Sequence, residues 1–155
     1  MLTSDVLAML ERLSGQILAQ LEAVPAEALN WQPPLRDTNS LYVIAQHTVA
    51  AGEWLTLHVA CGLPYSRDRD AEFRGQGDLT ALGTRYETWL AAARQALSDL
   101  TEANLAEIRH YQTVAGPVER SVGGILVHTV SHTANHLGHI ELTRQMWEAQ
   151  SASGA

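Results

Sequence analysis

Residues 128–139 read HTVSHTANHLGH, a segment in which histidine recurs at helical spacing. It contains four of the chain's seven histidines, at positions 128, 132, 136 and 139. An α-helix turns by about 100° per residue, so all four side chains fall within about 80° of one another. The segment therefore predicts a helix that carries a histidine stripe along one face.

A second stripe, mostly apolar, runs along the same helix about 120° away from the histidines. Together the two stripes cover close to half of the circumference, so we expect this side to be buried. The predicted helix begins near 122–125 and ends near Glu148, and a disordered tail is expected over 151–155. The second stripe consists of Val130, Thr133, Leu137 and Ile140; the residues expected to face water are Ser131, Gly138, Glu141, Gln145 and Glu148.

The same period predicts three further helices upstream. Along the first of them, apolar residues recur every three or four positions, and clusters of proline, glycine and polar residues separate the helices. Four helices of roughly 20 residues, with no clear strand run, indicate an all-α four-helix bundle, and we expect one domain over 1–150. The upstream helices are expected over about 3–23, 40–61 and 79–100; the connections are a loop over 24–39 with one helical turn, a polar surface crossover over 64–78 and a short hairpin around 115–117.

Composition narrows the class of protein. The formal charge of −7 and the scattered basic residues argue against a nucleic-acid partner. No apolar run approaches the roughly 20 residues that span a bilayer, and the first ten residues lack the positive region of a signal peptide. Cys61 is the only cysteine, which favours a reducing compartment. We therefore expect a cytoplasmic protein with neither a membrane nor a nucleic-acid partner.

The histidine stripe allows two interpretations. In the first, each imidazole is a buried polar group, hydrogen-bonded to a backbone carbonyl or to a threonine, asparagine or tyrosine side chain. In the second, two of them bind a metal ion, since residues four apart on a helix lie about 6 Å apart along its axis. His128 and His136 are about 12 Å apart along the axis, so the whole stripe cannot serve one ion. The spacing permits the pairs 128/132, 132/136 and 136/139 without choosing among them.

The second predicted helix supplies a candidate third ligand. His47 shares a face with Ile44, Ala51 and Trp54, so it should point inward. His58 lies about 16 Å further along and cannot reach the same ion. Three neutral imidazoles with an open fourth position would match a catalytic metal site better than a structural one.

Two segments together resemble the DinB-like (DinB/YfiT-like) family of metal-binding four-helix bundles. The first, residues 28–55, reads ALNWQPPLRDTNSLYVIAQHTVAAGEWL, with a tryptophan and prolines before a helix that carries one histidine. The second, residues 126–146, reads LVHTVSHTANHLGHIELTRQM and carries the H-x-x-x-H pattern. The resemblance runs from the first helix to about Met146.

The resemblance implies that His47, His132 and His136 are the metal ligands, which selects the 132/136 pair. It places His128 beside the ligands or in the pocket wall. Two positions depart from the H-R-G-Q that often follows the last ligand in this family. Leu137 stands in place of the arginine, which puts any anion-binding role of that position in doubt, and His139 stands in place of the glutamine. His139 is then expected to hydrogen-bond a ligand imidazole or to line the pocket.

The family implies a bundle with a long crossover, a divalent ion such as nickel or zinc, and frequent homodimers. Three functions remain open. The first is a metal-dependent enzyme acting on small molecules through a low-molecular-weight thiol, as an S-transferase or isomerase, or through water, as a hydrolase. The second is a non-catalytic or stress-associated metal-binding bundle. The third is a metal-free helical dimer.

Other residues receive simpler interpretations. No carboxylate is expected on the ligand faces, because Glu53 lies on the far side of its helix from His47, and Thr133 excludes an HExxH motif. The absence of a general base fits thiol activation better than hydrolysis. The segment RDRDAEFR (67–74) is expected to be a solvated part of the crossover. Trp31, Trp54 and Trp89 are expected in the core or the pocket wall, and Cys61 is not expected to be catalytic.

Overall fold

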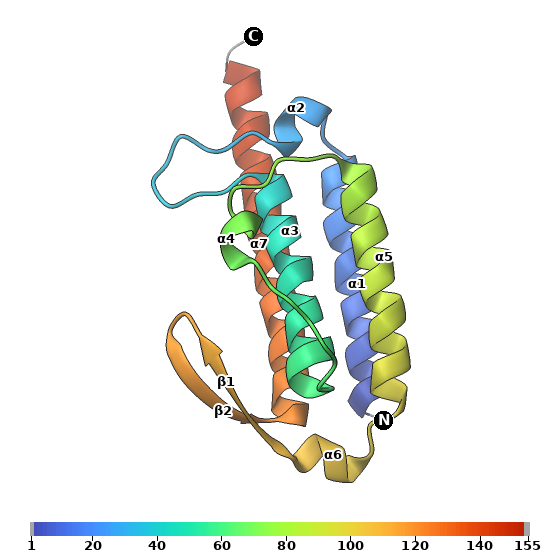
Figure 1. Ribbon diagram of the computed structural model, residues 1–155. Helices are drawn as coiled ribbons and strands as arrows, with labels where there is room; N and C mark the ends of the chain where they lie inside the picture. Colours follow the sequence, from blue (N-terminus) through green and yellow to red (C-terminus); the bar gives the residue numbers. More distant parts are fainter. Residues whose placement is uncertain (1, 154–155) are drawn as a thin grey trace.

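Four long helices form the body of the computed structural model, which describes residues 2–153 (Figure 1). Helix α1 packs against α5 and α7, and α3 packs against the same two helices. Helices α1 and α3 therefore lie diagonally across the bundle, and the connections before α3 and before α7 cross its two ends. The elements are α1 (Leu2–Glu22), α2 (Ala26–Leu29), α3 (Leu41–Glu53), the π-helix η1 (Trp54–Ala60), α4 (Arg69–Glu72), α5 (Leu79–Ser98), α6 (Glu102–Ala106), β1 (Ile108–Thr113), β2 (Gly116–Ser121) and α7 (Val122–Ser153).

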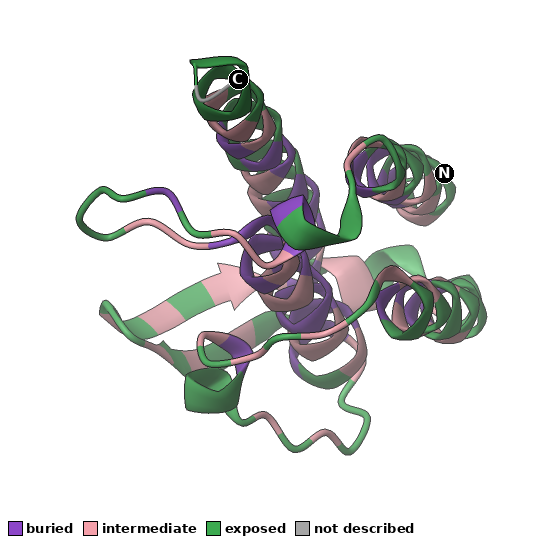
Figure 2. Cartoon of the chain, turned by 90° about the horizontal axis from the view of Figure 1, so that it is seen from above, coloured by how far each residue is buried: buried purple, intermediate pink, exposed green. Residues whose placement is uncertain are grey.

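The apolar residues that recur at helical spacing in the sequence form the core of the bundle. The apolar positions of α1, from Val6 to Leu21, are buried, and those of α5 and α7 face them (Figure 2). Polar side chains begin the helices: Ser40 Oγ accepts a hydrogen bond from the backbone N–H of Val43, and the Asp78 carboxylate accepts one from Ala81. Helix packing and capping therefore agree along the bundle.

Helices α3 and α5 approach each other closely at Gly52. Gly52 leaves room for the indole of Trp89, which is 1% exposed. The indole N–H donates to Thr56 Oγ1 over 2.9 Å, and the Tyr86 hydroxyl donates to the Ala45 carbonyl over 2.9 Å. These contacts satisfy the polar atoms of two large buried side chains and fix α3 against α5.

The predicted long helices and the predicted hairpin are present, and the ends of two helices differ from the sequence expectations. The second helix changes to a π-helix at Trp54, which widens its last turns. The predicted hairpin forms from β1 and β2, which pair antiparallel from Ile108–Ser121 to Thr113–Gly116. Helix α7 continues to Ser153, into the segment expected as a disordered tail, and residues 154 and 155 lie outside the described part of the chain.

The crossover before α5 was expected to be solvated, and that expectation is wrong for part of it. Glu72 is 4% exposed and Arg67 is half-buried, both turned toward α3. Tyr65 donates a hydrogen bond to the Glu53 carboxylate over 2.7 Å, and Arg85 of α5 binds the same carboxylate. The crossover is thus held against α3 by ionic contacts rather than by apolar packing. None of the described helices is apolar over a length sufficient to cross a bilayer.

Candidate metal centre

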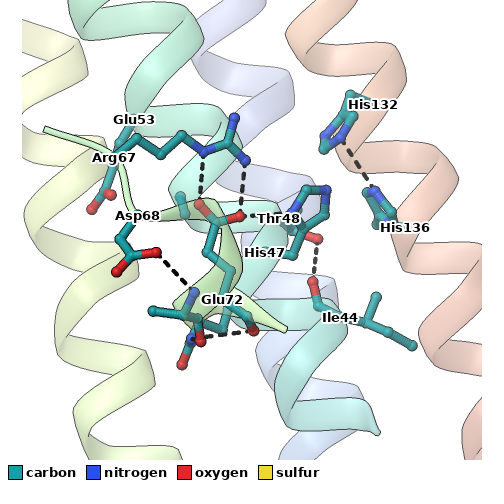
Figure 3. A network of polar contacts seen from close by, with 12 residues as sticks. Ile44, His47, Thr48, Glu53, Arg67, Asp68, Glu72, His132 and His136 are labelled. Carbon is teal, nitrogen blue, oxygen red and sulfur yellow. Dashed lines mark hydrogen bonds and ion pairs between the residues drawn. The ribbon is translucent and has the colours of Figure 1, made fainter. Parts of the chain in front are cut away.

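The structure brings His47 of α3 together with His132 and His136 of α7 (Figure 3). One ligand atom from each ring lies within 4.8 Å of the other two. The Nε2 atoms of His132 and His136 are 3.2 Å apart, and the ring of His47 lies 5.4 Å and 5.0 Å from theirs, centroid to centroid. Two helices whose histidines are 85 residues apart in sequence, at positions 47 and 132, therefore form one cluster of imidazoles.

The spacing of the ring nitrogens fits a bound cation. Ligand nitrogens at tetrahedral positions around a zinc-sized ion lie about 3.3 Å apart, close to the separation between His132 and His136. The described residues offer these three rings no hydroxyl or backbone carbonyl as a partner. The nearby hydroxyls of Thr129 and Thr133 donate instead to carbonyls one turn earlier, those of Ile125 and Thr129. The three imidazoles are therefore not hydrogen-bonded to hydroxyls or backbone carbonyls in the way expected of buried core histidines. The cluster could hold a metal ion.

A carboxylate from the crossover fixes the ring of His47. Glu72 Oε2 lies 2.8 Å from His47 Nδ1, and the side chains of His47 and Glu72 are 12% and 5% exposed. When Nδ1–H donates to this carboxylate, the lone pair of Nε2 is left free for a ligand. Arg67 donates to both oxygens of Glu72, over 2.7 Å and 2.9 Å (Figure 3). Both oxygens of Glu72 are therefore hydrogen-bonded, one to Arg67 alone and the other to Arg67 and His47.

Electrostatics keeps the α7 imidazoles neutral. Burial lowers the pKa of His132 to about 3 and that of His136 to about 4, and the neighbouring imidazoles add to both shifts. Burial alone would raise the pKa of Glu72, but hydrogen bonds from His47 and Arg67 outweigh it and lower that pKa. At neutral pH His132 and His136 are thus uncharged and Glu72 is ionised, and metal binding requires neutral imidazoles.

The remaining stripe histidines flank the cluster and are exposed. The ring of His128 lies 6.2 Å from that of His132, and burial of part of it lowers its pKa. His139 Nδ1 lies 3.2 Å from Nδ1 of His136, so it can accept the proton that His136 carries there. His58 is turned away, with Nδ1 2.8 Å from the Leu63 carbonyl. The stripe is therefore divided into two inner rings and two flanking ones.

Two cavities lie beside the cluster, and among the described residues His47 alone lines both. The smaller, about 310 Å³, opens toward the C-terminal part of α7 and is lined by His136, His139 and apolar side chains such as Phe73. The larger, about 490 Å³, lies beneath the tip of the hairpin and is lined by His128, His132, Trp54, Tyr111 and two arginines. Trp54 and Tyr111 meet edge to face at 5.5 Å, so the expected pocket tryptophan forms a wall of this cavity. Both volumes suit small molecules.

The sequence expectations missed Glu72 and Arg67. They considered only carboxylates on helix faces, and there Glu53 is indeed engaged elsewhere, with Tyr65 and Arg85. Glu72 reaches His47 from a helix of four residues, too short for any periodic pattern to show which side is buried. The one local signal is Phe73, the single large apolar residue within a charged segment.

A family model and several solved structures match this chain. A family model described as the DinB superfamily matches residues 9–140. A conserved protein from Enterococcus faecalis superposes with a TM-score of 0.72 at 14% identity, over 93% of this chain and 95% of that one. YfiT from Bacillus subtilis, described as a probable metal-dependent hydrolase with an unusual four-helix bundle topology, gives 0.68 at 16% identity, over 93% and 87%.

A mycothiol-dependent maleylpyruvate isomerase also superposes, with a TM-score of 0.63 at 16% identity, over 89% of this chain and 60% of that one. No curated protein matches the sequence significantly. At these identities the solved structures establish the fold alone.

Proposed function

The chain belongs to the DinB superfamily, and from this premise we propose that it is a metal-dependent enzyme acting on small molecules through a thiol. The observation that carries the proposal is the meeting of three imidazoles, with one ligand atom of each within 4.8 Å of the others, between two cavities. His47, His132 and His136 would hold a divalent ion and leave a further coordination position open. Three protein ligands and an open position are typical of catalytic rather than structural sites.

Neighbouring residues orient the ring of His47, and burial keeps the imidazoles of His132 and His136 uncharged. Glu72, held by Arg67, orients His47 and fixes the tautomer that leaves Nε2 free. The low pKa values of His132 and His136 keep their lone pairs available at neutral pH. His128 and His139 flank the proposed ligands, one in each cavity.

The surroundings favour a thiol over water as the activated group. Hydrolysis at such a site commonly uses a carboxylate as the general base. Glu72 is fully engaged with His47 and Arg67, and the lining of the larger cavity contains no other carboxylate. A divalent ion in the site would lower the pKa of a bound thiol and so supply the nucleophile without a base. Asp37 lines the smaller cavity and is paired with Arg36.

The relatives support this proposal in different ways. YfiT is described as a probable metal-dependent hydrolase, and the isomerase as mycothiol-dependent. The first supports a metal and the second supports a thiol. Neither identifies the substrate, the acceptor or the metal of this chain.

Cobalt substitution tests the proposal directly. Untagged protein is first analysed for bound nickel, zinc and other first-row metals, and is then loaded with Co²⁺ and titrated with a small thiol such as 2-mercaptoethanol. We expect one ion per chain and a new near-ultraviolet sulfur-to-cobalt absorption band upon thiol addition. A bound ion without any thiol-dependent spectral change would favour the non-catalytic metal-binding alternative, and protein that binds no divalent ion would contradict both.

The contact between Glu72 and His47 gives a second prediction. Glu72→Gln keeps the shape of the side chain but removes the charge that orients the imidazole, so zinc affinity should fall by about 10–100-fold. The matched control is Glu53→Gln, which alters another half-buried, arginine-paired carboxylate that does not touch the cluster. Competition with a chromophoric chelator measures both variants. Equal zinc affinity in the two would show that Glu72 has no part in binding.

A further inference from the structure

The larger cavity carries a charge that differs from the rest of the molecule. The chain has a formal charge of −7, yet this cavity is lined by Arg67 and Arg69 and by no carboxylate. Its other polar lining is uncharged or imidazole: three histidines, His47, His128 and His132, together with Tyr111, Gln112 and Thr113. A local positive site in an acidic protein indicates selection for a negatively charged ligand at this place.

The two arginines differ in whether their charge is available. Arg67 is neutralised by two hydrogen bonds to Glu72, and its guanidinium lies 5.3 Å from the centre of the Trp54 ring. Among the described residues, Arg69 has no ion pair or hydrogen bond, and its guanidinium lies 4.7 Å from the Phe73 ring. Stacking on an aromatic ring orients the guanidinium but leaves its N–H groups free to donate to an anion. Arg69 is thus the free cation of this cavity.

The other walls restrict the kind of anion. Trp54 and Tyr111 form an aromatic corner, and residues 112–115 at the hairpin tip also line the cavity. An inorganic ion would leave this aromatic surface uncovered in a space of about 490 Å³. A planar organic body fills such a corner, and a carboxylate matches the fork of a guanidinium.

We propose that the larger cavity binds a small organic carboxylate, with Arg69 as its anchoring cation and Trp54 and Tyr111 as the wall for its apolar body. The smaller cavity, which lacks arginine and is lined by Phe73 and other apolar side chains, is left for the second reactant. This inference rests on the proposed function in treating the carboxylate as the substrate. The anion site itself does not depend on a bound metal.

The test uses zinc-loaded full-length protein with benzoate and benzamide, which share a ring and differ in charge. We expect calorimetry to show benzoate binding at least tenfold more tightly than benzamide, and Arg69→Gln to weaken benzoate by about tenfold without affecting benzamide. Arg74→Gln, an exposed arginine five residues further along that lines neither cavity, should leave both affinities unchanged. Benzoate should shift the backbone amide resonances of residues 112–115.

Two outcomes would overturn the inference: an affinity for benzoate in Arg69→Gln equal to that of the unmodified protein, or amide shifts at 38–39 and 142–143 in place of the hairpin tip. The same titrations on metal-free protein separate this inference from the proposed function. If the chain binds no zinc, the proposed function fails, whereas a preference for benzoate that disappears in Arg69→Gln would still establish the anion site. If zinc binds and the preference does not depend on Arg69, the anion site fails alone.

Discussion

Replacing His136 with alanine is expected to lower the affinity for zinc by well over 100-fold. The change removes a direct ligand, so its effect should exceed the roughly 10–100-fold loss that follows removal of a partner outside the coordination sphere. His47→Ala should behave in the same way, although it lies on a different helix, because the three rings are close enough to bind one ion together. Zinc affinity is measured by competition with a chelator, beside the thermal midpoint of the metal-free protein.

His128→Ala is the matched control for this prediction. His128 lies on the same face of the same helix, two turns before His136, but its ring is exposed and flanks the cluster. Its removal should change zinc affinity by less than tenfold. If His128→Ala abolishes zinc binding while His136→Ala retains it, the ligands on α7 are not the pair His132 and His136. The metal-free midpoints should stay close to that of the unmodified protein, since these rings lie at the edge of the core.

Gly52→Ala is expected to cause the largest loss of stability among single-methyl additions. A Cβ at position 52 would overlap the six-membered ring of Trp89, which is packed on all sides and hydrogen-bonded to Thr56. Alanine gains about 1 kcal/mol over glycine within a helix, whereas forced overpacking of a filled core costs about 3 kcal/mol. The cost of the overlap therefore exceeds the gain in helix propensity, so the substitution should lower the free energy of unfolding. In a chain of this length, a net loss of about 2 kcal/mol lowers the thermal midpoint by roughly 4–8 °C.

The control for Gly52→Ala is Gly15→Ala in α1. An added Cβ at position 15 would meet no atom within 4 Å, so only the helix propensity changes and stability should rise slightly. Urea unfolding of both variants separates the two effects. If Gly52→Ala proves as stable as Gly15→Ala, α3 and α5 are not in the close contact described above.

Much of the fold could be predicted from periodicity, because each long helix buries a face that recurs every three or four residues. The first helix shows this clearly, because the apolar residues that recur at this spacing are all in the core: Val6, Leu10, Leu13, Ile17 and Leu21. The hairpin was also predicted near its turn, from Gly116 and Pro117. The π-helix from Trp54 to Ala60 could not be predicted, because its sequence is compatible with an ordinary α-helix and tertiary packing sets the wider turn.

Only part of the candidate site could be predicted from the sequence, and the reason is physical. Helical geometry placed His47 on an inward face and the α7 histidines on one stripe, but it left three possible pairs on α7. The resemblance to the DinB-like family selected His132 and His136, and the structure brings these two together with His47. Glu72 and Arg69 come from a short irregular crossover, where no period relates a residue to the direction of its side chain.

The position of His47 between the two cavities has a consequence for the order of events in a reaction. No other described residue lines both chambers, so a molecule in one and a molecule in the other would have only this imidazole in common. Both reactants can then be resident at once, one on each face of a single imidazole, and neither must depart before its partner arrives. Steady-state kinetics of a bisubstrate transfer at such a centre would show intersecting rather than parallel double-reciprocal lines.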